Sequence, residues 1–247
     1  MNFIEGSKPF SYSSDSKIGV LVIHGYTGAP GSLLPQAQAF ADAGYNVELP
    51  LLPGHGTTIN DMNKTKYTAW ITTVEESYRR LKSKCEKVFI FGLSMGGALA
   101  LYLAETKPDV SGIIIVNNAL FVNSISAKLV WFLKYFIKTV PGLGNDIKTP
   151  GVTEPCYEKN PTSAAHEAIK LFAIIKKNIH TVQCPAMIFK SSNDHVIPVE
   201  VAEYTFENIG SADKKLIYLN DSYHVATLDN DSDTICKVAI NFIKERS

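Results

Sequence analysis

The stretch Val88-Phe89-Ile90-Phe91-Gly92-Leu93-Ser94-Met95-Gly96-Gly97-Ala98-Leu99-Ala100 is an apolar run that breaks at Gly-x-Ser-x-Gly and continues with helix-forming residues. The apolar run predicts a buried strand, and the residues after the break predict a helix. A strand that enters a helix through so tight a turn forces its middle residue, Ser94, into a strained backbone conformation. Gly92 and Gly96 carry no Cβ atoms that would collide there. We therefore expect the Ser94 hydroxyl at the carboxyl end of the sheet, as a nucleophile.

Strands and helices alternate on both sides of this turn. Apolar runs predict strands at 18–23, 45–49, 111–116, 186–190 and 215–219, and amphipathic or capped segments predict helices at 32–43, 67–84, 199–208 and about 233–244. Apolar strands that alternate with helices indicate an α/β fold, with a mostly parallel, doubly wound sheet covered on both faces.

Residues 119–181 interrupt this alternation, because about sixty residues without a convincing strand are far more than one crossover needs. We expect residues 1–118 and 182–247 to form the core, and 119–181 to form an inserted helical cap over the carboxyl edge of the sheet. The first half of the insertion, 129–138, is apolar almost all round, with Lys128, Lys134 and Lys138 on a narrow polar edge, and 162–177 predicts a second helix. These apolar side chains either pack on their own domain or line an acyl pocket, and both alternatives stay open.

Composition narrows the class of partner. The 247-residue chain carries 24 basic and 24 acidic residues without a basic cluster, which disfavours nucleic acid and favours a neutral or weakly charged small substrate. The four cysteines are widely scattered and form no C-x-x-C pair, so we expect reduced, structural thiols and no zinc site. The first residues lack the pattern of a signal peptide, and no apolar run is long enough to span a bilayer, so a cytoplasmic location is expected.

A serine hydroxyl needs a base to remove its proton, and a histidine base needs a carboxylate to fix its tautomer. Among six histidines, His224 follows the last expected strand and so lies at the same sheet edge as Ser94. His24 and His55, in glycine-rich turns, are the next candidates, whereas His166 and His180 fall in or beside the second cap helix.

Asp194 follows the expected strand at 186–190 and is the preferred carboxylate. Asp221 and Asp229 are nearer to His224 in sequence, but a turn and a helix cap explain them equally well. The order Ser94, Asp194, His224 is the one used by α/β-hydrolases and differs from the orders of chymotrypsin and subtilisin.

Two backbone amides are candidates for an oxyanion hole. The amide of Met95 is unpaired at the start of a helix, and the amide of Tyr26 follows His24-Gly25 at the end of the first core strand. Taken alone, His24-Gly25 is equally well explained as a tight turn. This chemistry requires no metal and no organic cofactor.

With these residues in view, the chain resembles α/β-hydrolase-fold carboxylesterases, in particular the small bacterial monoacylglycerol lipases of the Bacillus type. The resemblance covers nearly the whole chain and rests on residues 24–28, 53–57, 92–97, 193–198 and 222–229. It implies a triad of Ser94, Asp194 and His224 and an oxyanion hole of Tyr26 and Met95. It also implies that Glu154, in Val152-Thr153-Glu154-Pro155, binds the glycerol hydroxyls, although a solvated cap glutamate is the competing interpretation.

The family commonly has phenylalanine at the position of Tyr26, and a phenol in the pocket wall would favour a polar head group.

The expected function is therefore a serine esterase that forms and hydrolyses an acyl-enzyme, with monoacylglycerols as substrates. A short-chain carboxylesterase, a thioesterase or a feruloyl-type esterase would share the triad, and a non-catalytic ligand-binding protein could share the fold. Haloalkane dehalogenase chemistry is disfavoured because it needs a carboxylate in place of Ser94. The expected partner is a small lipid ester, with transient contact between the apolar cap and a membrane surface.

Overall fold

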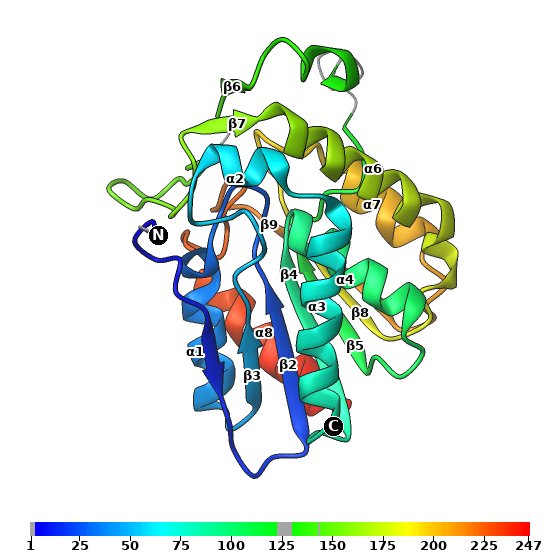
Figure 1. The fold of residues 1–247 in the computed structure, drawn as a ribbon. Coiled ribbons are helices and arrows are strands. Elements are labelled where there is room, and N and C mark those ends of the chain that lie inside the picture. Colours follow the sequence, from blue (N-terminus) through cyan, green and yellow to red (C-terminus); the bar gives the residue numbers. More distant parts are fainter. Residues whose placement is uncertain (1–2, 123–129, 143) are drawn as a thin grey trace.

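The computed structural model describes residues 3–122, 130–142 and 144–247, and its centre is a seven-stranded sheet (Figure 1). In spatial order the strands are β1 (Phe10–Tyr12), β3 (Asn46–Leu49), β2 (Ile18–Ile23), β4 (Lys87–Leu93), β5 (Gly112–Val116), β8 (Ala186–Ser191) and β9 (Lys214–Leu219). All neighbouring strands are parallel except the edge pair β1 and β3. The predicted doubly wound, mostly parallel sheet is confirmed.

Helices cover both faces of this sheet. The 3-10 turn η1 (Pro30–Leu33) leads into α1 (Leu34–Asp42), which packs on one face together with α8 (Ser232–Lys244). The other face carries α3 (Tyr67–Lys82), α4 (Met95–Thr106) and α7 (Val199–Asn208). A buried apolar cluster fills the space on each side of the sheet, so the strands are apolar on both faces, as parallel sheets require.

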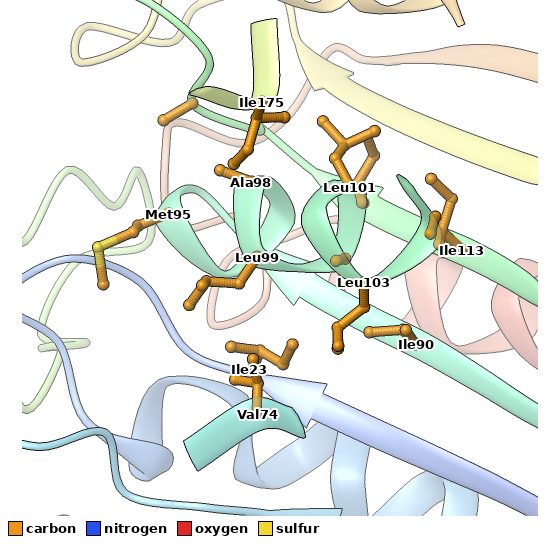
Figure 2. Packing of buried hydrophobic residues seen from close by; sticks show 14 of the residues in the cluster. Ile23, Val74, Ile90, Met95, Ala98, Leu99, Leu101, Leu103, Ile113 and Ile175 are labelled. Carbon is orange, nitrogen blue, oxygen red and sulfur yellow. The ribbon is translucent and has the colours of Figure 1, made fainter. Parts of the chain in front are cut away.

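The helix α4 is apolar all round because it is surrounded on every side. Figure 2 shows Leu99 and Leu103 directed towards Ile23 and Ile90 of the sheet, whereas Ala98 lies beside Ile175 on another helix. This helix, which starts directly after Ser94, is therefore held in place by the core. The position of its first residue is fixed by packing as well as by the turn.

Outside the residues between β5 and β8, strand β1 and helix α2 (Ile59–Lys64) were absent from the sequence prediction. Strand β1 extends the sheet by only three residues, too few for a recognisable alternation. Helix α2 begins at Thr58, whose hydroxyl accepts a hydrogen bond from the amide of Asp61 at 3.1 Å. This Thr-x-x-Asp pattern is a capping signal that could have revealed the helix.

Residues 117–185, between β5 and β8, are here called the inserted segment; its strands β6 (Thr139–Pro141) and β7 (Lys159–Pro161) and the start of its helix α6 (Thr162–Asn178) lie beyond the carboxyl ends of the parallel strands (Figure 1). The expectation of no strand there is wrong, because β6 and β7 form a small antiparallel pair. The expected second helix is present as α6, followed by the 3-10 turn η2 (Ile179–Thr181).

The apolar run at 129–138 is only partly described. Residues 130–133 are helical, and the positions of Lys128, Leu129 and Leu143 lie outside the described residues. Within the described ranges, every helix is too short or too polar to cross a bilayer.

Replacing Gly96 with alanine is expected to destabilise the fold strongly. A Cβ atom there would overlap the carbonyl oxygen of Ile23 and lie 2.8 Å from that of His24, and neither backbone group can move without disturbing the end of β2. We expect Gly96→Ala to lower the free energy of unfolding by about 3 kcal/mol or more. Chemical denaturation of the purified variant measures this change.

The matched control is Gly44→Ala, since Gly44 also has a special backbone conformation (φ +87°) but leaves open space where a Cβ would stand. Its cost is expected to be about 1 kcal/mol, from the left-handed conformation alone. Equal losses in the two variants would contradict the steric explanation.

Candidate active site

Ser94 occupies the strained turn that the sequence predicts. Its backbone has φ 54° and ψ −116°, it precedes the first residue of α4, and its amide donates to the Val116 carbonyl of β5 at 2.9 Å. A Cβ at Gly92 would overlap the backbone of Gly96, so the turn closes only with glycine there. The Ser94 side chain is 8% exposed and lines a cavity, where a substrate can reach it but bulk water has little access.

His224 and Asp194 come together from the loops that follow β9 and β8. The Nδ1 atom of His224 lies 3.0 Å from both carboxylate oxygens of Asp194. The carboxylate also accepts hydrogen bonds from the amides of Val196, at 2.9 Å, and Ile197, at 2.8 Å. This arrangement places the proton of the neutral imidazole on Nδ1 and leaves Nε2 as the basic nitrogen.

Asp194 is ionised despite its burial. Burial alone would raise the pKa of this carboxyl, but attraction and hydrogen bonding to His224, together with the nearby Lys190 ammonium and backbone amides, hold the pKa well below its usual range. Its side chain is fully buried. A permanent negative charge beside the imidazole is what a triad needs to stabilise an imidazolium.

Ser94 and His224 line the same cavity, but no hydrogen bond joins their side chains among the described residues. Such bonds are often long in free enzymes and shorten in the substrate complex. All three residues of the predicted triad are therefore at one place, with the acid–base pair already formed.

The competing histidines have other partners. Nε2 of His24 accepts the amide proton of Leu52 at 3.1 Å, so its Nδ1 carries the proton and donates to the carbonyl of Gly25 at 3.0 Å. Burial, and then the adjacent His55, lower the pKa of His24 to about 3. Burial lowers the pKa of His55 to about 4. Both rings are buried, neutral and structural, and His24 fixes the loop that follows β2.

The competing carboxylates do not contact the imidazole ring. Asp221 is exposed and pairs with Lys148 at 2.6 Å. Asp229 is buried and accepts backbone hydrogen bonds from Lys148 at 2.7 Å, Thr149 at 3.0 Å and Tyr223 at 2.9 Å. Asp229 therefore joins the inserted segment to the loop that carries His224, a role beyond the turn or cap that the sequence suggested.

Sequence reasoning also missed Asp146 of the inserted segment. Its carboxylate accepts hydrogen bonds from the backbone amides of His195 and His224, each at 3.1 Å, and lies 2.7 Å from Nδ1 of His195. Its own carbonyl accepts from Val225 at 3.1 Å. Asp146 thus binds both the loop that carries Asp194 and the loop that carries His224.

Asn117, which directly follows β5, was missed as well. Its side-chain amide donates to the carbonyl of His224 at 2.7 Å, and its side-chain oxygen accepts the amide proton of Ser191 at 2.8 Å. Its φ of 46° is left-handed, a conformation in which asparagine is enriched. The pair Asn117-Asn118, directly after a predicted strand, was the sequence signal that could have revealed this residue.

Tyr26 and Met95, whose amides are the predicted oxyanion donors, line the same cavity as Ser94. Met95 is the first residue of α4, so its amide has no partner within the helix. Tyr26 lies in the loop fixed by His24, and its amide has no backbone acceptor within the described residues. A Cβ at Gly25 would stand 3.4 Å from Cβ of Ser94, so this loop passes directly beside the serine.

A cavity of about 270 Å³ opens above Ser94. Its polar lining residues are Ser94, His224, Thr27 and Glu154, here called its polar end, together with Asn160 and Thr162. The remaining wall is largely apolar and comes mostly from the inserted segment and the loop after Asp194; its members include Val122, Val130, Leu133, Val140, Ala165, Ala168, Ile169, Phe172, Val196 and Ile197. Many of the apolar side chains of the insertion therefore line a pocket, and others pack in the core, so both alternatives hold for different residues.

Glu154 lies at the polar end of this cavity and is not a solvated surface residue. Its carboxylate accepts a hydrogen bond from the Ser32 hydroxyl at 2.8 Å, and a Cβ at Gly28 would contact the same carboxylate oxygen. Burial raises its pKa, although the Ser32 hydrogen bond and His224 oppose this.

The phenol of Tyr26 contacts the inserted segment. It donates to the carbonyl of Pro161 at 2.7 Å and so ties the loop after β2 to the inserted segment. The expectation that this phenol favours a polar head group stays a prediction, because its oxygen can still accept a hydrogen bond from a substrate hydroxyl.

All four cysteines are free thiols. Within the described residues, no group of three histidine, cysteine, aspartate or glutamate side chains could hold a metal ion.

Comparison with known proteins supports the resemblance seen in the sequence. The chain is 41% identical over 244 residues to the thermostable monoacylglycerol lipase of Bacillus sp. (strain H-257), covering 99% of this chain and 97% of that protein. A solved structure of a metagenome-derived lipolytic enzyme, from work on LipS and LipT, is 39% identical with a TM-score of 0.95 and covers 98% of this chain and 99% of that one. The monoacylglycerol lipase of Paleococcus ferrophilus has the same fold, with a TM-score of 0.81 at 17% identity over 97% of this chain and 99% of that one.

The model of the Hydrolase_4 family, described as serine aminopeptidase, S33, matches residues 14–231. Together with the α/β-hydrolase sheet and the full-length relatives, this match shows that the chain is a serine hydrolase of the Hydrolase_4 family.

Proposed function

We propose that the protein hydrolyses monoacylglycerols to a fatty acid and glycerol, with Ser94, Asp194 and His224 as its catalytic triad. The observation that carries the proposal is one cavity with Ser94 and the Asp194-bonded His224 at its polar end and an apolar wall beyond them. The relative with 41% identity, a monoacylglycerol lipase, supports the same substrate class.

In the first half-reaction, Oγ of Ser94 attacks the ester carbonyl carbon while Nε2 of His224 takes the hydroxyl proton. The tetrahedral intermediate collapses, the bond between the carbonyl carbon and the glycerol oxygen breaks, and the imidazolium returns its proton to the leaving glycerol. Asp194 keeps the ring in the correct tautomer and stabilises the imidazolium. Water then attacks the acyl-enzyme by the same route and releases the fatty acid.

The negative charge on the carbonyl oxygen develops beside the amides of Tyr26 and Met95. Both amides are held in place before substrate binds, one by the buried His24 and the other by the start of α4. A preorganised donor of this kind contributes about 3 kcal/mol to transition-state stabilisation. These two amides form the proposed oxyanion hole.

We further propose that residues 119–181 act as a cap that buries the acyl chain, which stabilises binding by about 0.8 kcal/mol per CH₂. Glu154 at the polar end would accept hydrogen bonds from glycerol hydroxyls. Among the described residues, Ser32 is the one side chain that donates to this buried carboxylate, which leaves lone pairs for this purpose.

Hydrolysis of 1-monoacylglycerols is expected to increase with chain length and to peak at medium or long chains, because the cavity wall is apolar. Ser94→Ala is expected to lower kcat by about 10⁴-fold or more with an unchanged denaturation midpoint. Initial rates on a chain-length series, with p-nitrophenyl esters of matched length beside it, measure both.

Activity confined to short aryl esters would reduce the function to a general carboxylesterase, and a preference for acyl thioesters would make it a thioesterase. Substantial activity of Ser94→Ala would refute the triad. Failure of the wild-type protein to react with a serine-directed phosphonate would favour a non-catalytic binding protein.

Glu154→Gln is expected to raise KM for monoacylglycerols about tenfold, because a charged hydrogen-bond acceptor for the glycerol is lost. The variant keeps an oxygen for the Ser32 hydroxyl, so the wall of the pocket is preserved. The matched substrate control is a p-nitrophenyl ester of equal chain length, for which KM should stay unchanged. A parallel rise for both substrates would mean that Glu154 only shapes the pocket.

We also propose that the inserted segment contacts membrane surfaces transiently. Four neighbouring aromatic side chains are exposed there, with Tyr135 at 74% and Phe136 at 73% exposure, alongside Trp131 and Phe132. An exposed aromatic cluster of this kind is typical of an interaction site. A cytoplasmic location remains a prediction.

The double variant Tyr135→Ser/Phe136→Ser is expected to bind phosphatidylcholine vesicles at least tenfold more weakly, since each buried aromatic side chain contributes about 1.5–3 kcal/mol. Cosedimentation with vesicles measures this. Tyr12→Ser, which removes an exposed aromatic residue from the distant strand β1, is the control. Equal vesicle binding by all three proteins would rule out this contact surface.

A further inference from the structure

Lys190 is a buried lysine next to the proposed triad. It is the fifth residue of β8, whose sequence is otherwise Ala-Met-Ile-Phe before it and serine after it, and it is 0% exposed. Burying an ammonium ion is costly unless a negative charge and hydrogen bonds compensate it. The groups that contact the Lys190 ammonium therefore explain how a lysine can be buried at this position.

The ammonium group contacts the catalytic acid directly. Nζ donates to Oδ2 of Asp194 and, at 2.6 Å, to the carbonyl of Ile197. The same carboxylate faces Nδ1 of His224, and the side chains of Lys190 and Asp194 are both fully buried. Lysine, aspartate and histidine thus form a buried line of alternating charge once the imidazole is protonated.

Other charged groups near this line come from the inserted segment and from α7. Asp146 of the inserted segment and Glu200 of α7 act on Lys190 from a distance, and Glu154 faces His224 from the far side of the cavity. The Asp146 carboxylate is occupied by His195 and by the backbone amide of His224. Burial lowers the pKa of Lys190, and attraction to Asp194 opposes this. Among the described residues, Asp194 is the one acidic side chain that contacts the ammonium.

We propose that Lys190 is a positioning residue of the triad: its buried ammonium holds the Asp194 carboxylate in place and offsets part of the negative charge that faces the His224 ring. This inference rests on the proposed function of the triad. An adjacent cation weakens the attraction between the carboxylate and an imidazolium, which favours the neutral ring. The enzyme would therefore stay active further into the acidic range.

A purely structural role for Lys190 predicts something different. The loop after β8 is also held by the amides of Val196 and Ile197, which donate to the other oxygen of Asp194. If Lys190 only fixed this loop, its removal would lower the rate at every pH by the same factor. The charge effect instead moves the pH at which activity is half-maximal.

Two neutral variants test the charge. Lys190→Met keeps the length of the chain without a donor, and Lys190→Gln keeps a donor without the charge. We expect the acidic limb of kcat/KM, measured with a neutral p-nitrophenyl ester, to move to higher pH by about one unit in both variants. Lys148→Met removes an exposed positive charge that pairs with Asp221 near the same loop, and it should leave the limb in place.

An unmoved limb in the two Lys190 variants, whatever their rates, overturns the inference while leaving the proposed function intact. A wild-type protein without Ser94-dependent hydrolysis would instead remove the proposed function, and this inference with it. The two failures are therefore distinguishable, because the first needs an active wild-type enzyme.

A stability measurement covers the case in which the single Lys190 variants do not fold. Asp194→Asn leaves the buried ammonium without its counter-charge, so adding Lys190→Met to that background should raise the denaturation midpoint. A lower midpoint in the double variant would mean that Lys190 is retained for a reason other than Asp194, and would overturn the inference.

Discussion

The close approach of α4 to the end of β2 is the constraint on which the site depends. The backbone of Gly96 lies against the carbonyl oxygens of Ile23 and His24, and Ser94 consequently takes a left-handed conformation. This strain places the hydroxyl at the cavity and leaves the amide of Met95 without a helical partner. The apolar packing of α4 on all sides offsets the cost, because the turn cannot relax without moving a helix that the core holds (Figure 2).

Burial of charge at this site is compensated by a dense set of hydrogen bonds. Asp194 is bonded to two amides, an imidazole and an ammonium, and Asp229 to several backbone amides. Unpaired, either carboxylate would be expensive to bury and would take up a proton instead. The geometry of the loops around His224 therefore follows from the need to satisfy buried carboxylates as much as from the contacts of the ring itself.

Much of this arrangement could be read from the sequence, and the exceptions have physical causes. Uninterrupted apolar runs located the strands that are buried on both faces, and the positions of Ser94, Asp194 and His224 after those strands led to the proposed triad. Lys190 and Asp146 were missed because their roles arise only when loops distant in sequence meet. A lysine near the end of a strand normally marks an exposed edge, and no local pattern shows that this one is enclosed by the loop that follows it.

A lipid ester requires a polar site for its head group and an apolar wall for its alkyl chain, and the inserted segment contributes to both. At one end the carboxylate of Asp146 and the backbone amides of Lys148 and Thr149 are hydrogen-bonded to the loops that carry Asp194 and His224. At the other end the aromatic side chains around Phe136 face solvent. A monoacylglycerol has a polar head that must be held accurately and an alkyl chain that needs only an apolar wall. The hydrogen bonds of the inserted segment accordingly lie beside the proposed triad, where the polar head would bind. This separation of a hydrogen-bonded part from an exposed aromatic part supports the substrate class proposed from the cavity.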